Sequence, residues 1–256
     1  MVNTKYLKIV AATCLLFSVY MLFSSSSVAN PLFLIVPPIY LIGMIGQYYI
    51  KGGEDKVDEE VQISGAFWAA IMVIPAVLLR YATVKVGNDM MKSLEGTWDP
   101  YIVWAIKGFF AHSFVACFFI YMMVQSYMKE FNTPKQAVQF GSFMGIIFFV
   151  LTAPLELDGE YNQGIMGLVR YFFGCMTFHL IAGCIIGHKT FTSVNIKEEF
   201  KWPGFMSMFV PWIIYSVYRT ILLQIDFYTS NVMAFFFIDV VMCTIMVLMY
   251  MDIRRA

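Results

Sequence analysis

The chain has 256 residues, of which 60% are hydrophobic and only 13% are charged, and its mean hydropathy is +0.71. Soluble domains carry about 25% charged residues, so this composition excludes an ordinary soluble protein and predicts an integral membrane protein. The formal net charge is zero, and no basic tract indicates binding to nucleic acid.

Apolar stretches long enough to cross a membrane recur along the whole chain. A transmembrane helix needs about 20 predominantly apolar residues, and eight stretches meet this requirement. Little sequence remains between them, so we expect one all-α domain over residues 1–256, a polytopic transmembrane helix bundle. The predicted spans cover residues 6–24, 32–50, 64–86, 101–126, 137–155, 164–187, 204–225 and 231–251.

The distribution of basic residues predicts the orientation of these spans. Eleven fall on one side, namely Lys5, Lys8, Lys51, Lys56, Lys129, Lys135, Lys189, Lys197, Lys201, Arg254 and Arg255. Only Lys85 and Lys92 fall on the other side. Because short cytoplasmic loops carry the excess of lysine and arginine, both termini are predicted to be cytoplasmic. The source membrane is predicted to be a bacterial or archaeal inner membrane or an organelle membrane.

The first span also resembles a signal peptide. Lys5 and Lys8 precede an apolar stretch, and the small residues at 27–29 would suit a cleavage site before Asn30. We expect a retained anchor. Cleavage would instead leave seven spans and an exterior N-terminus.

Four basic residues lie inside predicted spans, at similar depth on the outer side. They are Arg80, Lys107, Arg170 and Arg219. Each is about 9 Å inside the outer end of its span, from the 1.5 Å rise per helical residue. Charges at such depth usually face a protein interior or a watery cavity. Two interpretations stay open: structural ion pairs with snorkelling side chains, or a vestibule that binds an anion or carboxylate.

Acidic residues on the same side are candidate partners or bases. Glu156 lies in a short outer loop, and Asp239 lies eight residues into the last predicted span, next in sequence to the span that holds Arg219. Ion pairing of Arg219 with Asp239 would suit the structural interpretation. A carboxylate that activates water would suit an enzyme.

The histidines and cysteines do not predict a metal or cofactor. His112 and His179 lie at unequal depths, which fits poorly with a haem held between them. Motifs of the H-E-x-x-H type are absent, and the five cysteines have no metal-binding or redox spacing. We expect His179 to be a hydrogen-bonded helix contact and His188 to face solvent or lipid headgroups.

The sixth predicted span contains closely spaced glycines. Gly183 and Gly187 form a small-x-x-x-small surface, which lets a second helix approach closely. This spacing predicts a central position for the span in the bundle. The loop at 51–60 has mixed charges and is predicted to be a solvated turn.

A series of residues along about half of the chain follows a family pattern: Lys107, Phe140-Gly141, Arg170, His179, Gly183, Gly187, Val210-Pro211 and Tyr218. Their order and spacing resemble those of the PrsW-type intramembrane proteases, a superfamily that includes the non-catalytic anterior-pharynx-defective subunit of gamma-secretase. Val103 and Trp104 occupy the places of the proteases' glutamate pair, and Thr152 or Ala153 that of a further glutamate. A second family histidine, expected near Tyr215, is also missing. The resemblance therefore implies a relative that acts as a scaffold or binds substrate. Of the family's functional residues, only Lys107 and His179 are present in this chain.

Three functions follow as hypotheses. The first is a non-catalytic membrane subunit or binding protein that holds a partner helix, peptide or lipid headgroup through Arg80, Lys107, Arg170 and Arg219. Its partners would be membrane lipid and other membrane protein chains. The second is an intramembrane enzyme acting on a peptide or lipid-linked phosphate, with His179, Glu156 or Asp239 as catalytic candidates. The third is a small-anion transporter, which prolines at 37–38, 75 and 211 would allow by breaking helices.

Overall fold

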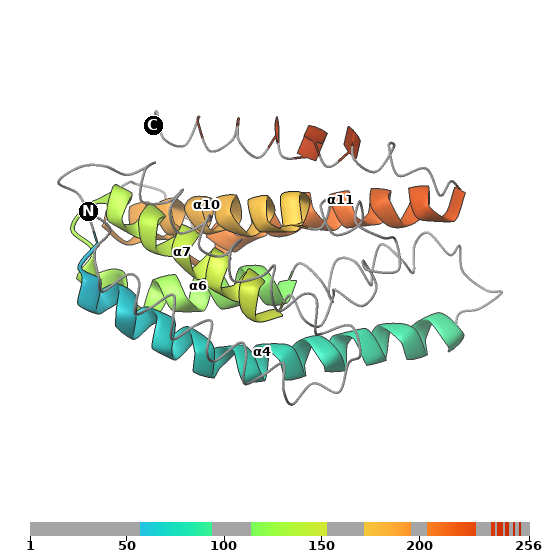
Figure 1. The fold of residues 1–256 in the computed structure, drawn as a ribbon, viewed down its shortest axis with the longest axis horizontal. Coiled ribbons are helices and arrows are strands. Elements are labelled where there is room, and N and C mark those ends of the chain that lie inside the picture. Colours follow the sequence, from blue (N-terminus) through green and yellow to red (C-terminus); the bar gives the residue numbers. More distant parts are fainter. Residues whose placement is uncertain are drawn as a thin grey trace.

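The structure is a computed structural model that describes residues 57–93, 114–152, 172–195 and 204–228, with short pieces at 237–238, 240–242, 244–245, 248 and 251. All regular structure in these described residues is helical, which confirms the all-α prediction for this part of the chain. The long helices run side by side along one axis (Figure 1). They are α4 (Glu59–Ser93), α6 (Val115–Ser126), α7 (Pro134–Thr152), α10 (Thr177–Asn195) and α11 (Phe209–Tyr228).

Of the described helices, α4 alone is long and apolar enough to cross a membrane, over Glu60–Gly87. Two shorter apolar helical segments lie at Val115–Ser126 and Phe205–Tyr218. The helix α4 contains the third predicted span and extends beyond both of its ends. The predicted spans at 6–24 and 32–50 lie outside the described residues.

Side chains at the helix starts explain where α4 and α7 begin. The Asp58 carboxylate accepts a hydrogen bond of 2.9 Å from the backbone N–H of Glu60, which caps α4. Thr133 caps α7, since its hydroxyl accepts a bond from the Gln136 N–H, and Pro134 occupies the first helical position. The Gln136 side chain returns to the N–H of Asn132 at 2.7 Å, much as in a capping box.

The helix α10 differs from the predicted sixth span at its C-terminal end. It continues to Asn195, whereas the prediction ended the span at 187. Thr192 and Ser193 bond back to carbonyls three or four residues earlier, and Thr190 is fully buried. These side chains are polar, but Thr192 and Ser193 are satisfied within the helix and Thr190 by Ser207 of a neighbouring segment, so the helix continues through them.

The helices α7 and α10 form the centre of the described bundle. They run antiparallel, because Ala137, Gly141 and Gly145 meet Gly187, Gly183 and His179 in that order. A Cβ atom added to any of the four glycines would collide with a backbone carbonyl of the opposite helix. The prediction that Gly183 and Gly187 allow a close helix approach is therefore confirmed.

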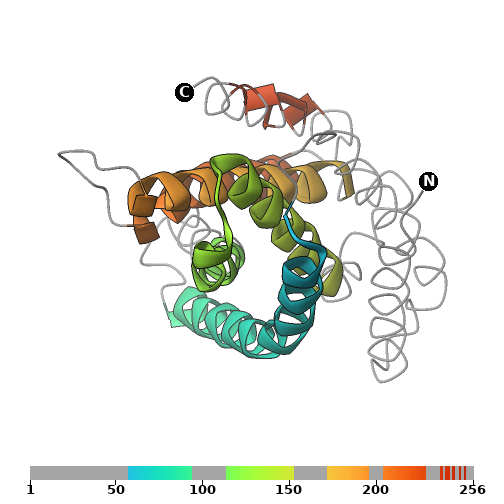
Figure 2. The same ribbon diagram turned by 90° about the vertical axis from the view of Figure 1, so that its left-hand side faces the viewer.

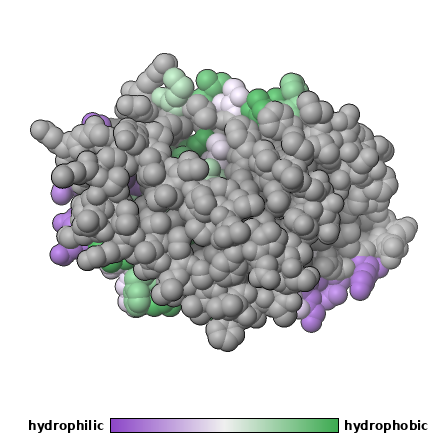
Figure 3. All heavy atoms as spheres, in the orientation of Figure 1, coloured by the Kyte–Doolittle hydropathy of each residue, from purple (hydrophilic) through white to green (hydrophobic). Residues whose placement is uncertain are grey.

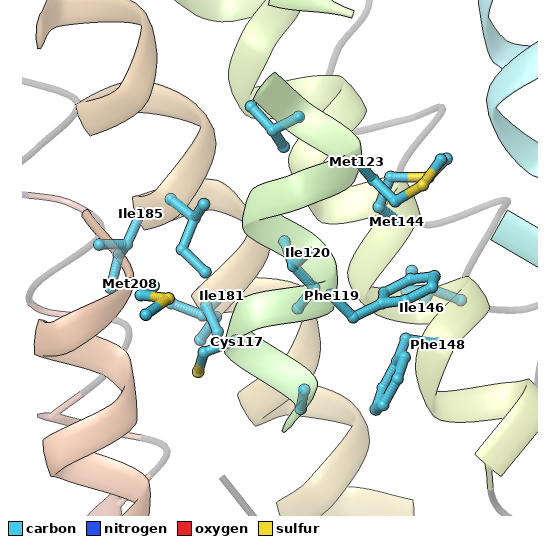
Figure 4. Packing of buried hydrophobic residues seen from close by; sticks show 14 of the residues in the cluster. Cys117, Phe119, Ile120, Met123, Met144, Ile146, Phe148, Ile181, Ile185 and Met208 are labelled. Carbon is cyan, nitrogen blue, oxygen red and sulfur yellow. The ribbon is translucent and has the colours of Figure 1, made fainter. Parts of the chain in front are cut away.

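The helix α6 packs against this pair and completes the core. Cys117 and Ile120 of α6 are fully buried, beside Ile181 and Ile185 of α10 (Figure 4). On the other side of α6, the rings of Phe119 and Phe148 lie 4.7 Å apart. Short helical segments, η2 (Met128–Glu130), the π-helical η3 (Phe172–Met176) and η4 (Gly204–Met208), precede α7, α10 and α11.

Candidate functional site

His179 lies where α7, α10 and α11 converge. Its side chain is only 6% exposed. Its backbone carbonyl is the atom that a side chain at Gly145 would strike, so the residue sits within the closest contact between α7 and α10. The π-helical segment η3 ends three residues before it.

The hydrogen bond of His179 fixes one proton on its ring. Its Nδ1 lies 2.6 Å from the carbonyl oxygen of Cys175, one turn earlier in the chain. A carbonyl oxygen only accepts, so Nδ1 must carry the hydrogen, and in the neutral ring Nε2 is the nitrogen with the lone pair. The prediction of a hydrogen-bonded histidine within the bundle is confirmed.

Four aromatic rings enclose the imidazole. The rings of Phe148 and Phe149 on α7 lie 5.8 and 5.6 Å from it, and that of Phe178 lies 5.2 Å away. Tyr215 on α11 lies 6.2 Å away, edge to face, and stacks on Phe178 at 3.9 Å. These rings come from α7, α10 and α11, so they hold the imidazole at the junction of the three helices.

Cys175 and Tyr215 are parts of this site that sequence reasoning did not identify. The Tyr215 hydroxyl lies 3.4 Å from the Cys175 sulfur, which joins α11 to the segment that holds His179. Tyr215 occupies the place where the family resemblance expects a second histidine. The sequence feature that could have identified Cys175 is its separation of four residues from His179, which places both residues on one helical face.

Arg80 is the predicted vestibule residue whose side chain can be placed. Every third or fourth residue of α4 is buried or half-buried, and Arg80 belongs to this stripe. The stripe contains Gly65, Ala69, Val73, Ala76, Arg80, Thr83 and Gly87. Its first members pack against the core, and Thr83 donates a hydrogen bond to the Arg80 carbonyl. Arg80 therefore lies on the bundle-facing side of α4.

The other predicted site residues are not brought together by the described part of the chain. Lys107, Glu156, Arg170 and Asp239 lie outside the described residues. Arg219 falls within α11, but its side chain is not among those described. The described residues contain no group of three His, Cys, Asp or Glu side chains that could hold a metal ion.

His188, at the other end of α10, differs from its predicted exposed position. It is half-buried, and its Nδ1 is buried with no hydrogen-bond partner among the described residues. Burial, with a smaller contribution from the adjacent Lys189, lowers the pKa of His188 below its usual 6.5.

Comparison with known proteins adds no relative. No protein-family model matches the chain, and neither a curated protein nor a solved structure matches it. The resemblance to the PrsW-type superfamily therefore stays a prediction.

Proposed function

We propose that this chain is a multi-pass membrane protein of about eight spans that serves as a non-catalytic subunit or binding protein. It holds an anionic group, a carboxylate or a phosphate, in a vestibule lined by Arg80, Lys107, Arg170 and Arg219. The membrane-spanning length of α4 supports this proposal. So do the hydrophilic side chains at opposite ends of the long axis, with apolar surface between them (Figure 3).

The position of Arg80 is the observation that carries the proposal. Between residues 63 and 82 the exposed side chains of α4 are apolar, with Leu78 at 64% and Tyr81 at 70% exposure, and suit contact with lipid. Arg80 lies on the opposite, bundle-facing stripe. Charged residues inside membrane spans usually face a protein interior or a watery cavity, which agrees with this position. A guanidinium suits a carboxylate or phosphate through paired hydrogen bonds.

The surroundings of His179 favour binding over catalysis. Its contacts include four aromatic rings and a backbone carbonyl. These contacts hold the imidazole in a fixed position between helices, as suits a structural or binding role. The enzyme hypothesis depends on Glu156 and Asp239, which lie outside the described residues, so it remains a prediction, as does the transporter hypothesis.

Native mass spectrometry of the protein, gently extracted from its own membrane, tests the proposal. We expect a bound anionic lipid or peptide, or a partner chain at fixed stoichiometry. Arg80→Gln should reduce the retained fraction at least fivefold. The matched control is Lys85→Gln, which removes an exposed charge from the same helix and should leave retention unchanged.

Two results would contradict the proposal. One is a protein that retains neither anionic ligand nor partner chain. The other is equal loss in Arg80→Gln and Lys85→Gln, which would indicate a general effect of charge and not a site on the bundle-facing side. A melting temperature close to that of the parent protein would show that the variants fold.

A further inference from the structure

The helix α4 is anchored along its first half and not along its second. Two residues before α4, the Val57 N–H donates a 3.1 Å hydrogen bond to the buried Gln139 side chain of α7. One turn into the helix, the Ser64 and Tyr127 hydroxyls are 2.7 Å apart. Gly65 lies directly against the Phe140 ring, and Ala69 is fully buried.

Burial along α4 decreases from its start toward Pro75. Gln62, Gly65 and Ala69 are buried, and Ala76, directly after Pro75, is the last described residue of α4 that packs against the core. After it, every described side chain of α4 is half-buried or exposed. The bundle-facing stripe continues through Arg80 and Thr83 but without a buried member. Segments with few buried contacts open at lower free energy than segments anchored in a core.

Pro75 also weakens the helix at this point. Proline has no N–H to donate to the carbonyl of Ile71, and its ring crowds that carbonyl, which bends a helix. The ribbon of α4 changes direction along its length, most clearly when the bundle is viewed end-on (Figure 2). Pro75 thus lies where the packing of α4 against the core ends.

We propose that Pro75 is a hinge about which residues 77–93, the C-terminal arm of α4, move relative to the α6–α7–α10 core. Residues 59–74, the N-terminal arm, stay fixed to that core. Arg80 lies five residues beyond the hinge, so the motion carries it toward and away from the bundle. This inference does not depend on a ligand at Arg80, and it is tested separately.

Double electron–electron resonance in lipid bilayers tests the hinge. Spin labels are attached to paired cysteines in a background whose native cysteines are replaced by alanine. The outer pair is Val86→Cys with Phe118→Cys, and the inner pair is Ile63→Cys with Gln125→Cys, all at exposed positions of α4 and α6. We expect the outer distance distribution to be at least twice as wide as the inner one.

Pro75→Ala restores the missing donor and should narrow the outer distribution to the width of the inner one. The control is Pro134→Ala, since a proline in the first helical position of α7 removes no intrahelical bond. It should leave both widths unchanged. Equal widths for the two pairs in the parent protein would overturn the hinge, as would an outer width that Pro75→Ala does not change. The parent comparison involves no proline substitution, so it decides the matter even if Pro75→Ala fails to fold.

Discussion

Gly141 and Gly183 face each other across the contact between α7 and α10, and each would strike the other's carbonyl if it carried a side chain. Without side chains, the two backbones approach until each helix touches the other's peptide groups. In a bilayer, where water gives no hydrophobic drive between helices, such close contact is a main source of helix association. The fully buried aromatic and aliphatic side chains around the contact fill the remaining space.

Gly145→Ala should be much more destabilising than Gly65→Ala. The new methyl group at Gly145 meets the rigid backbone carbonyl of His179, whereas at Gly65 it meets the end of the Phe140 ring, which can turn aside. We expect overpacking at Gly145 to lower the free energy of unfolding by about 3 kcal/mol and that at Gly65 by about 1 kcal/mol. Unfolding in mixed detergent measures both. An equal decrease in the free energy of unfolding in the two variants would show that α7 and α10 can move apart easily.

His188 should make stability depend on pH. Its pKa is lowered in the folded protein, so the unfolded chain binds the proton more readily. The fold is therefore most stable above the unfolded pKa of about 6.5 and loses stability as the pH falls through and below that value. We expect the melting temperature to fall between pH 7.5 and 5.5, and to fall less in His188→Gln.

Lys189→Gln separates the two causes of the lowered pKa of His188, burial and the adjacent positive charge. It removes the smaller, electrostatic contribution and leaves the burial of His188 in place. The variant should therefore keep most of the pH dependence. A His188→Gln variant with the full dependence of the parent protein would assign the effect to other groups.

At the scale of elements, the start of α4 depends on one buried side chain. Gln139 accepts the Val57 N–H, and Val57 is only 3% exposed although it ends a stretch predicted to be solvated. Gln139→Leu should leave that N–H buried without a partner, at a cost of about 1–3 kcal/mol. Hydrogen exchange at residues 57–64 should accelerate. Gln125→Leu, at an exposed position of α6, is the control and should not change it.

The sequence predicts long helices well, because a long stretch of apolar residues can be recognised from the residue types alone. The predicted span at 64–86 lies within α4, and the spacing of Gly183 and Gly187 correctly indicates a helix contact. The sequence did not indicate that α10 continues beyond the predicted end of the span at 187, where Thr190 is polar yet buried and bonded at 2.9 Å to Ser207 of another element. Such pairing depends on the fold and leaves no local signal.

The candidate site was predicted less completely for the same reason. His179 was identifiable as a lone intramembrane histidine. Tyr215 is 36 residues away in sequence and joins it only when α11 packs against α10. Arg80 was predicted to face the interior from the cost of buried charge, and its position on the bundle-facing stripe of α4 agrees with that prediction.

At the scale of the whole molecule, the proposed topology places the two ends of α4 on opposite sides of the membrane. Single-cysteine variants Glu60→Cys and Asp89→Cys, both at exposed positions, test this with a membrane-impermeant maleimide. In intact cells or sealed organelles oriented with the proposed outer face outward, Asp89→Cys should be labelled. Glu60→Cys should be labelled only after permeabilisation. Labelling of both from one side would refute a membrane crossing by α4.

The antiparallel contact of α7 and α10 also has a consequence for biosynthesis. Ala137 and Gly187 are in contact but fifty residues apart in the chain, so α7 leaves the ribosome well before its partner. In the proposed membrane topology, the glycine surface of α7 exposes its peptide groups to lipid or to the insertion machinery until α10 follows. A nascent chain stalled before residue 187 would thus display an incomplete helix surface, which is the kind of feature that membrane quality-control proteases can recognise.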